Sequence, residues 1–190
     1  MSDRSPEPPV PVARYESYSH EAMAAEVEQG NDPVAAGETG ARWTELARRM
    51  EDATADLAGL IAGTHETWQG KGGDAARASM NRAAQWLSHS AVVSASVGQS
   101  VTGQAGAAAR ARADMPPPVD YDPAAMIRGA AASGRLFDLA ALSDEMAARA
   151  DEAEAARMKA IDVMRTRDEA LRGLVPKESF PAPPSLGGSS

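Results

Sequence analysis

The chain has 190 residues and a mass of 19.8 kDa, the size of one domain with short tails. Its 27 acidic residues outnumber its 19 basic ones, which argues against a sequence-independent nucleic-acid surface and against binding to anionic membranes. The absence of cysteine excludes disulfides, thiolate metal sites and thiol nucleophiles.

Alanine dominates the apolar residues. It supplies 41 positions, whereas Leu, Ile, Val and Phe together supply 26, too few for a wide core of bulky side chains. Alanine is the best helix former and lets helices approach closely. We therefore expect an all-α chain, an elongated helical bundle that buries its apolar surface through long, tight helix contacts.

The N-terminal residues lack the apolar stretch of a cleavable signal peptide. The stretch over residues 88–109 has no Lys, Arg, Asp or Glu and has the length of a membrane span, but it carries Ser, Gln, Gly and Thr. We therefore expect no transmembrane segment.

Proline placement divides the chain. All 13 prolines fall in four places and leave two long windows, 34–115 and 124–175, free of them. Because proline breaks helices, these windows are predicted to be helical, and 17–29 is predicted as a short helix upstream. A helical domain at 17–174 is expected between a disordered segment, 1–16, and a Pro/Gly/Ser-rich disordered tail, 175–190.

The first window predicts a helical hairpin. Apolar residues recur at spacings of three and four, which indicates a helix that ends between His65 and Trp68. A turn over 68–74 follows, with Gly73 or Asp74 as the cap of a second long helix that starts at Ala75 and ends before Met115. Two helices joined by so short a turn must lie antiparallel. The first seam consists of Trp43, Leu46, Met50, Ala53, Leu57, Leu60 and Thr64, and the second includes Ala76, Met80, Ala83, Leu87, Ser94, Val97, Val101 and Ala108.

Three prolines then interrupt the chain, and Asp122-Pro123 gives the order of a helix start, an N-cap followed by proline. A short helix to about Ser133 is predicted, then an apolar corner at Gly134, Leu136 and Phe137, then a last long helix from about Leu139. The apolar face of that helix includes Leu142, Met146, Ala153, Ala160, Met164, Leu171 and Leu174.

Catalytic patterns are missing. The three histidines lie in separate predicted elements, and His65-Glu66 lacks the second histidine of a metalloprotease helix. Lys71-Gly72-Gly73 lacks the full spacing of a phosphate loop and follows a helix rather than a strand. We therefore expect a protein that is not an enzyme, with no catalytic residue, no metal site and no cofactor.

Several features in order resemble the PPE family of actinobacterial type VII (ESX) secretion substrates. They are Trp43-x-x-Leu46-Ala47, Trp68-x-Gly70 in a turn, Ala75-Ala76, Met80, Trp86-Leu87 and a long Ala-rich helix ended by Met115 and three prolines. The final segment from Phe137 through Met164 is similar to that family's last helix. The resemblance covers about residues 17–174.

The resemblance implies a secreted heterodimer. The hairpin would bind a small PE-like helical hairpin, and the WxG turn, here Trp68 and Gly70, would form half of a bipartite export signal. The other half, Tyr-x-x-x-Asp/Glu, does not follow Tyr15, Tyr18 or Tyr121 in this chain, so we expect the partner to supply it. The residues predicted to bind that partner are Trp43, Leu46, Met50, Leu57, Leu60, Met80 and Leu87.

The resemblance also implies a cytosolic chaperone that grips the tip between the last two helices, at Gly134, Leu136 and Phe137. The alternative, in which Leu136 and Phe137 fold back as a hydrophobic cap, remains open. Trp86 and Val93 could face the last helix or the partner, and the last helix is favoured.

The protein is accordingly expected in the cytosol before export and then, through the type VII machinery, outside the cell or at its surface. An alternative function is a self-assembling, homo-oligomeric structural protein of the cell envelope. A helical enzyme with an unrecognised site is a third hypothesis.

Overall fold

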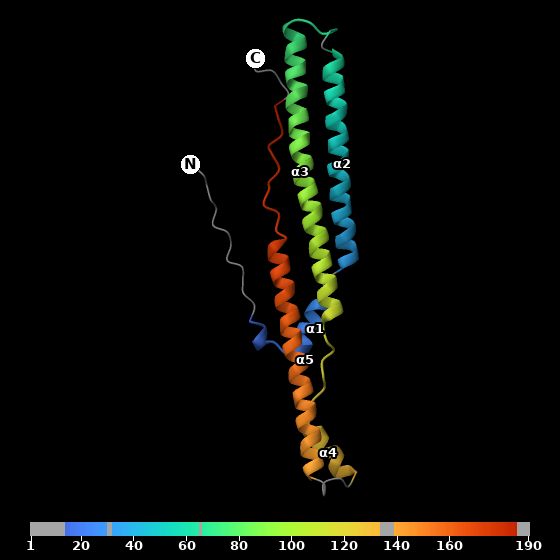
Figure 1. Ribbon diagram of the computed structural model, residues 1–190, viewed down its shortest axis with the longest axis vertical. Coiled ribbons are helices and arrows are strands. Elements are labelled where there is room, and N and C mark those ends of the chain that lie inside the picture. The colour runs from blue at the N-terminus through green and yellow to red at the C-terminus, as the bar shows by residue number, and fades with distance from the viewer. Residues whose placement is uncertain (1–13, 30–31, 65, 134–138, 186–190) are drawn as a thin grey trace, which may run out of the picture. The chain divides into compact units, whose positions relative to one another are not determined.

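A computed structural model describes residues 14–29, 32–64, 66–133 and 139–185 (Figure 1). Over these residues the chain is helical and has no strand. The 3-10 helix η1 (Tyr15–Ser17) is followed by the α-helices α1 (His20–Glu28), α2 (Pro33–Thr64), α3 (Lys71–Asp114), α4 (Pro123–Ala132) and α5 (Leu139–Gly173). The predicted all-α class and the long helical hairpin are confirmed.

Helix boundaries follow the proline and glycine signals with one correction. α4 begins as predicted, with Pro123 in its first turn and the Asp122 side chain accepting a hydrogen bond of 2.9 Å from the Ala125 N–H. α3 begins at Lys71 rather than Ala75, so the prediction that Gly73 or Asp74 caps it is wrong. The N–H of Asp74 already donates to the carbonyl oxygen of Gly70, at 3.1 Å, which places the first helical turn immediately after Gly70.

The chain divides into two compact units. The first lies within Met1–Asn31 and Ala111–Asp168 and contains η1, α1, α4, the end of α3 and most of α5. The second lies within Asp32–Arg110 and Glu169–Ser190 and contains α2, most of α3 and the end of α5.

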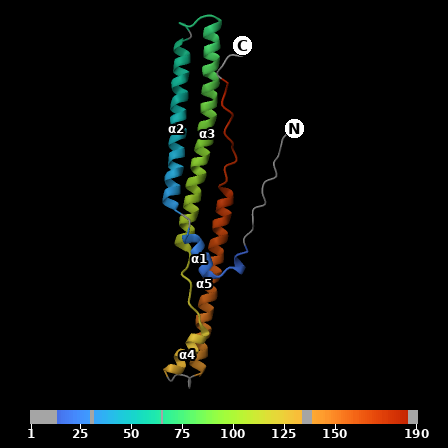
Figure 2. The same cartoon turned by 180° about the vertical axis from the view of Figure 1, so that it is seen from behind.

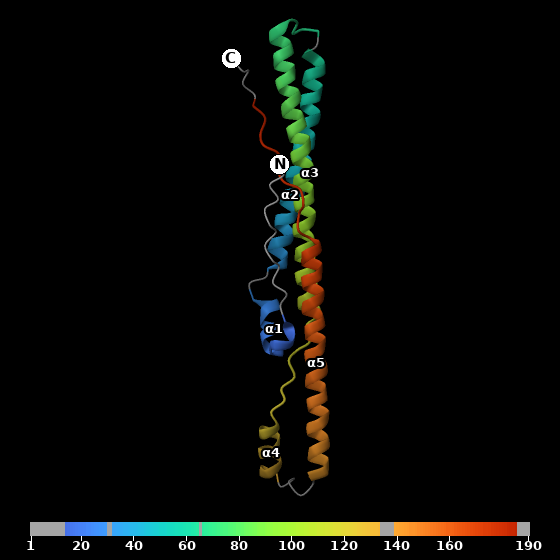
Figure 3. The same cartoon turned by 90° about the vertical axis from the view of Figure 1, so that its left-hand side faces the viewer.

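In the first unit, α1 packs on α5. Met23 and Val27 of α1 are buried with Ala160, Ile161 and Met164 of α5, and Tyr15 and Ala111 complete the cluster. Met23 and Val27 lie four residues apart, so one face of this short helix supplies both. In Figures 1 and 3, α4 lies beside the first turns of α5.

In the second unit, α2 and α3 lie side by side and antiparallel (Figures 1 and 2). Small residues occupy the contact: Gly40 and Ala47 of α2 are buried, as are Ala91, Ser94 and Gly98 of α3. Small side chains let the two helices approach closely over the ~48 Å that 32 helical residues span. Glycine and serine, together with alanine, therefore make this close contact possible.

After α5 the chain continues in non-helical form over residues 175–185. This segment runs beside α3, as the views in Figures 1 and 2 agree. No stretch of the described helices combines the length and apolarity that a bilayer crossing requires.

Candidate partner-binding and export-signal site

The turn between α2 and α3 holds the backbone of Trp68 while the residue stays half exposed. The Trp68 N–H donates to the Thr64 carbonyl oxygen at 2.9 Å, continuing the hydrogen-bond pattern of α2. Its own carbonyl oxygen accepts from Nη1 of Arg77 at 2.6 Å. The Trp68 residue is nevertheless 50% exposed. A large aromatic surface is thus presented at the end of the hairpin from a fixed backbone.

Two glycines make this turn possible. Gly70 has φ of +87°, in the left-handed region that favours glycine, and no other described residue has a positive φ. Gly73 has no room for a side chain, because a Cβ there would lie 2.2 Å from the carbonyl oxygen of Trp68. The motif glycine therefore sets the direction of the chain, and Gly73 permits close packing behind it.

Arg77 braces the same turn from α3. Its side chain is only 13% exposed, forms an ion pair with Asp74 and donates to the Thr64 carbonyl oxygen at 3.4 Å as well as to Trp68. Carbonyl groups at the end of a helix lack partners within the helix, and Arg77 supplies one for α2. No local sequence signal identifies Arg77, because its position one turn after Gly73 acquires a role only when the hairpin closes.

The predicted partner-binding residues of α2 occupy a partly open flank. Leu46 is 38% exposed and Leu60 is 59% exposed, while Met50 and Leu57 are half-buried. Met50 lies against α3, where its sulfur is 3.8 Å from Oγ of Ser94. The flank therefore combines side chains that pack within the hairpin with exposed side chains that a partner could contact.

The other three predicted residues are half-buried. Met80 and Leu87 lie on α3, and Trp43 lies on α2 in contact with Phe180, with the ring centroids 5.9 Å apart. Trp86, expected against the last helix, instead donates its indole N–H to the carbonyl oxygen of Pro181, at 3.0 Å. Both tryptophans thus meet the segment that follows α5.

Charged side chains accompany the apolar flank. Glu45 accepts hydrogen bonds from Arg48 and Arg49 at 2.8–3.0 Å, and these bonds lower its pKa to about 2. Arg48 also pairs with Asp52 at 2.6 Å. These pairs use the i, i+3 and i, i+4 spacings of a helix surface, where each contributes little to stability.

The residues predicted to contact a chaperone, Gly134, Leu136 and Phe137, lie outside the described residues.

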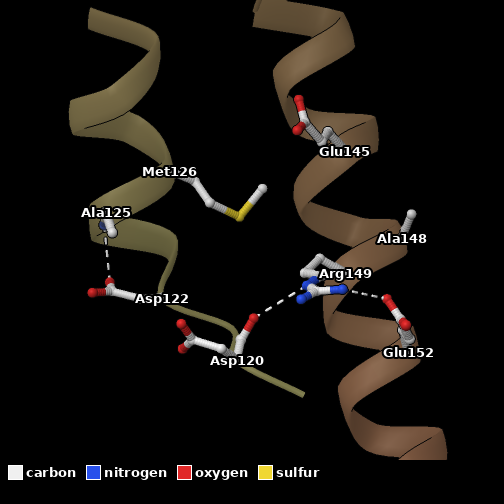
Figure 4. A pocket seen from close by; sticks show the side chains of 8 residues that line it. All are labelled: Asp120, Asp122, Ala125, Met126, Glu145, Ala148, Arg149 and Glu152. Atoms are coloured by element: carbon white, nitrogen blue, oxygen red, sulfur yellow. Dashed lines mark hydrogen bonds and ion pairs between the residues drawn. The ribbon is translucent and has the colours of Figure 1, made fainter. Parts of the chain in front are cut away.

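A shallow pocket of about 500 Å³ lies between the start of α4 and α5 in the first unit (Figure 4). Arg149 crosses it, with Nε donating to the carbonyl oxygen of Asp120 at 3.1 Å and Nη1 to Glu152 at 2.8 Å. Asp122 is occupied as the cap of α4. Asp122 therefore caps a helix and Glu152 pairs with Arg149, and among the described residues no group of three or more His, Asp or Glu side chains is placed to hold a metal ion.

Two comparisons with known proteins bear on this arrangement. No curated protein matches the chain. The family model of the PPE family matches residues 14–170, a range that includes both helices of the hairpin and the Trp68–Gly70 turn. Since this match covers more than half of the chain, the protein belongs to the PPE family, whose members are associated with type VII secretion.

Proposed function

We propose that this protein is a non-enzymatic substrate of a type VII secretion system that pairs with a small PE-like helical hairpin. The α2–α3 hairpin binds this partner, and the Trp68–Gly70 turn forms half of an export signal that the partner's Tyr-x-x-x-Asp/Glu motif completes. Export delivers the folded pair out of the cytosol, to the outside of the cell or its surface.

The observation that carries this proposal is the exposure of Trp68. A tryptophan at the end of a hairpin commonly serves as an apolar plug, and it would then be buried. Here the side chain is half exposed, although hydrogen bonds to Thr64 and from Arg77 fix the backbone. The local fold makes little use of the indole, which supports a role in recognition.

The first experiment compares the export of two variants of the same turn. Trp68→Ala is expected to retain helicity and the complex with the partner but to lose secretion from a host with a type VII system. Gln69→Ala, the control at the exposed neighbouring position, is expected to be secreted like the parent. Equal secretion of Trp68→Ala and the parent would remove Trp68 from the signal.

The second experiment tests the partner-binding flank. Leu60→Glu places a charge on an exposed apolar position of α2 and is expected to weaken a co-expressed PE-like complex at least about tenfold, as loss of an interface anchor does. Val92→Glu is the control, because Val92 is 62% exposed on α3 and lies outside the predicted set. An equal effect of both substitutions would contradict the assignment of the flank.

The competing function, a homo-oligomeric envelope protein, predicts a different result for the chain alone. Light scattering would then give a defined multiple of the chain mass without a partner, and a PE-like chain would leave that mass unchanged. A secretion substrate that requires a partner is expected to self-associate without a defined mass and to become a 1:1 complex when the two chains are co-expressed.

A further inference from the structure

The segment after α5 is attached to the α2–α3 hairpin at several points. At its start, Gln104 donates from Nε2 to the carbonyl oxygen of Leu174 at 3.3 Å, and the Leu174 side chain lies where a Cβ on Gly103 would stand. Further on, Oγ of Ser96 donates to Glu178 at 2.8 Å, and Trp86 donates to Pro181. These contacts follow α3 in descending order, so the segment runs antiparallel to that helix.

The spacing of these contacts indicates an extended chain. From Gln104 to Trp86 the helix rises ~27 Å at ~1.5 Å per residue. From Leu174 to Pro181 a polyproline II segment covers ~22 Å at ~3.1 Å per residue. The long Trp86 side chain can account for the remaining difference. The segment therefore lies along the helix in an extended conformation.

The chemistry of the last contact is that of proline-peptide recognition. The indole N–H of Trp86 needs an acceptor where it is partly buried, and the carbonyl oxygen of Pro181 provides one at 3.0 Å. The neighbouring Phe180 ring lies on Trp43 at 5.9 Å, tilted by 34°. Prolines at 181, 183 and 184 fix the backbone near the extended form and so reduce the entropy that binding costs.

We propose that Trp43 and Trp86 form a binding site for an extended, proline-containing peptide segment, and that residues 176–184 of this chain are its ligand. Trp86 recognises the backbone, Trp43 holds the aromatic side chain before the first proline, and the pairing of Ser96 with Glu178 sets the register. The ligand segment begins after the family match ends at residue 170. The site does not depend on the proposed export function.

The first test traps the contact in the full chain. Because the chain has no cysteine, Ser96→Cys with Glu178→Cys gives one defined pair of thiols. Oxidation should form an intramolecular disulfide, which shifts the monomer band on a non-reducing gel. Disulfides between two chains give a separate dimer band. Bridging should be at least roughly tenfold faster than for Gln99→Cys with Glu178→Cys, because contact raises the effective concentration of the thiols. Equal rates for the two pairs would show that the segment is not bound and overturn the proposal.

The second test measures recognition between separate molecules. A labelled peptide spanning residues 176–185 is titrated against a full-length chain whose own ligand is disabled by Phe180→Ala and by Pro→Ala at 181, 183 and 184. The peptide should bind this chain, and it should bind the parent chain more weakly because the parent's own segment competes. No binding up to millimolar peptide, or equal binding to both chains, would overturn the proposal.

The residue-level control uses two tryptophans and the same substitution. In the chain with the disabled segment, Trp86→Phe removes the indole N–H and should weaken peptide binding roughly two- to tenfold, the range expected for one hydrogen bond. Trp68→Phe, at the far end of the hairpin, should leave the peptide affinity unchanged. A peptide with Pro181, Pro183 and Pro184 replaced by alanine should bind more weakly, and equal affinity for both peptides would show that these prolines are not recognised.

Discussion

Gly40 of α2 and Gly98 of α3 face each other so closely that a Cβ built on either would lie 2.9 Å from the carbonyl oxygen of the other. Both residues are buried. The threonines next to this contact leave no extra room, since the same Cβ on Gly40 would approach Oγ1 of Thr102 at 2.3 Å, and that on Gly98 would approach Oγ1 of Thr44 at 2.7 Å. The two helices therefore cross backbone to backbone at this point.

Gly40→Ala should destabilise the chain although alanine favours helices. The added methyl group meets backbone atoms of α3 that cannot move aside, so the helices must separate, at a cost of about 1–3 kcal/mol. The measurement is the free energy of unfolding by urea, followed by circular dichroism.

Gly59→Ala is the matched control in the same helix, because a Cβ there meets nothing within 4 Å. It should stabilise the chain by roughly 0.5–1 kcal/mol through the higher helix propensity of alanine. Similar effects of the two substitutions would mean that the close crossing is not present in solution.

The WxG turn offers a second pair of glycines for comparison. Gly73→Ala should lower the midpoint of thermal unfolding, because its Cβ would overlap the Trp68 carbonyl group that Arg77 holds. Gly72→Ala, one residue earlier in α3, meets nothing within 4 Å and should be neutral or stabilising. A loss of stability in Gly72→Ala alone would contradict the turn geometry.

Local sequence signals were enough to predict the long helices. The spacing of Trp43, Met50 and Leu57 identified α2, and Asp122-Pro123 identified the start of α4. α3 begins earlier than these signals indicate, because Lys71-Gly72-Gly73 has low helix propensity and only the hairpin closed around Gly73 makes a helical turn favourable there.

Contacts between distant parts of the sequence could not be predicted from periodicity. Tyr15 lies 153 positions from Asp168 and contacts it through polar groups that no apolar pattern reveals. The segment around Phe180 has neither helical nor strand spacing, and its proline content is typical of disorder. Its contacts depend on Trp43 and Trp86 of the hairpin, which single-sequence reasoning does not place next to it.

Tyr15 should make stability fall at alkaline pH. Burial, followed by its hydrogen bond of 2.5 Å to Asp168, raises its pKa from 10.0 to about 12, although the positive charge of Arg167 opposes this shift. The folded state therefore holds the phenol proton more tightly than the unfolded state. The stabilisation of the folded state that results from this raised pKa is complete below pH 10.0 and is lost as the pH rises to about 12. The free energy of unfolding falls by no more than roughly 2.7 kcal/mol over this range.

Tyr15→Phe isolates this effect. It should cost about 1.5–3 kcal/mol at neutral pH through the lost hydrogen bond to the Asp168 carboxylate, and it should show a smaller further loss of stability between pH 10.0 and 12 than the parent. The comparison is the change in the urea midpoint of unfolding with pH across this range. Tyr121→Phe, an exposed position of the same unit, is the control and should show the same change with pH as the parent. Identical slopes for Tyr15→Phe and the parent would contradict the raised pKa.

The segment after α5 should compete with the partner for Trp43. Trp43 belongs to the predicted partner-binding flank, and Phe180 lies on its ring. Two side chains cannot cover the same face, so partner binding there requires Phe180 to leave. Phe180→Ala should therefore raise the affinity for a PE-like partner a few-fold, measured by calorimetry on the full chain.

Lys177→Ala, in the same segment but without a described contact to either tryptophan, should leave the partner affinity unchanged. If Phe180→Ala binds the partner with unchanged affinity while the disulfide trapping succeeds, the segment and the partner use different faces of the hairpin. Trp43 would then belong to the proline-peptide site alone, and the partner-binding flank would begin at Leu46 and extend toward the exposed Leu60 and the Trp68 turn.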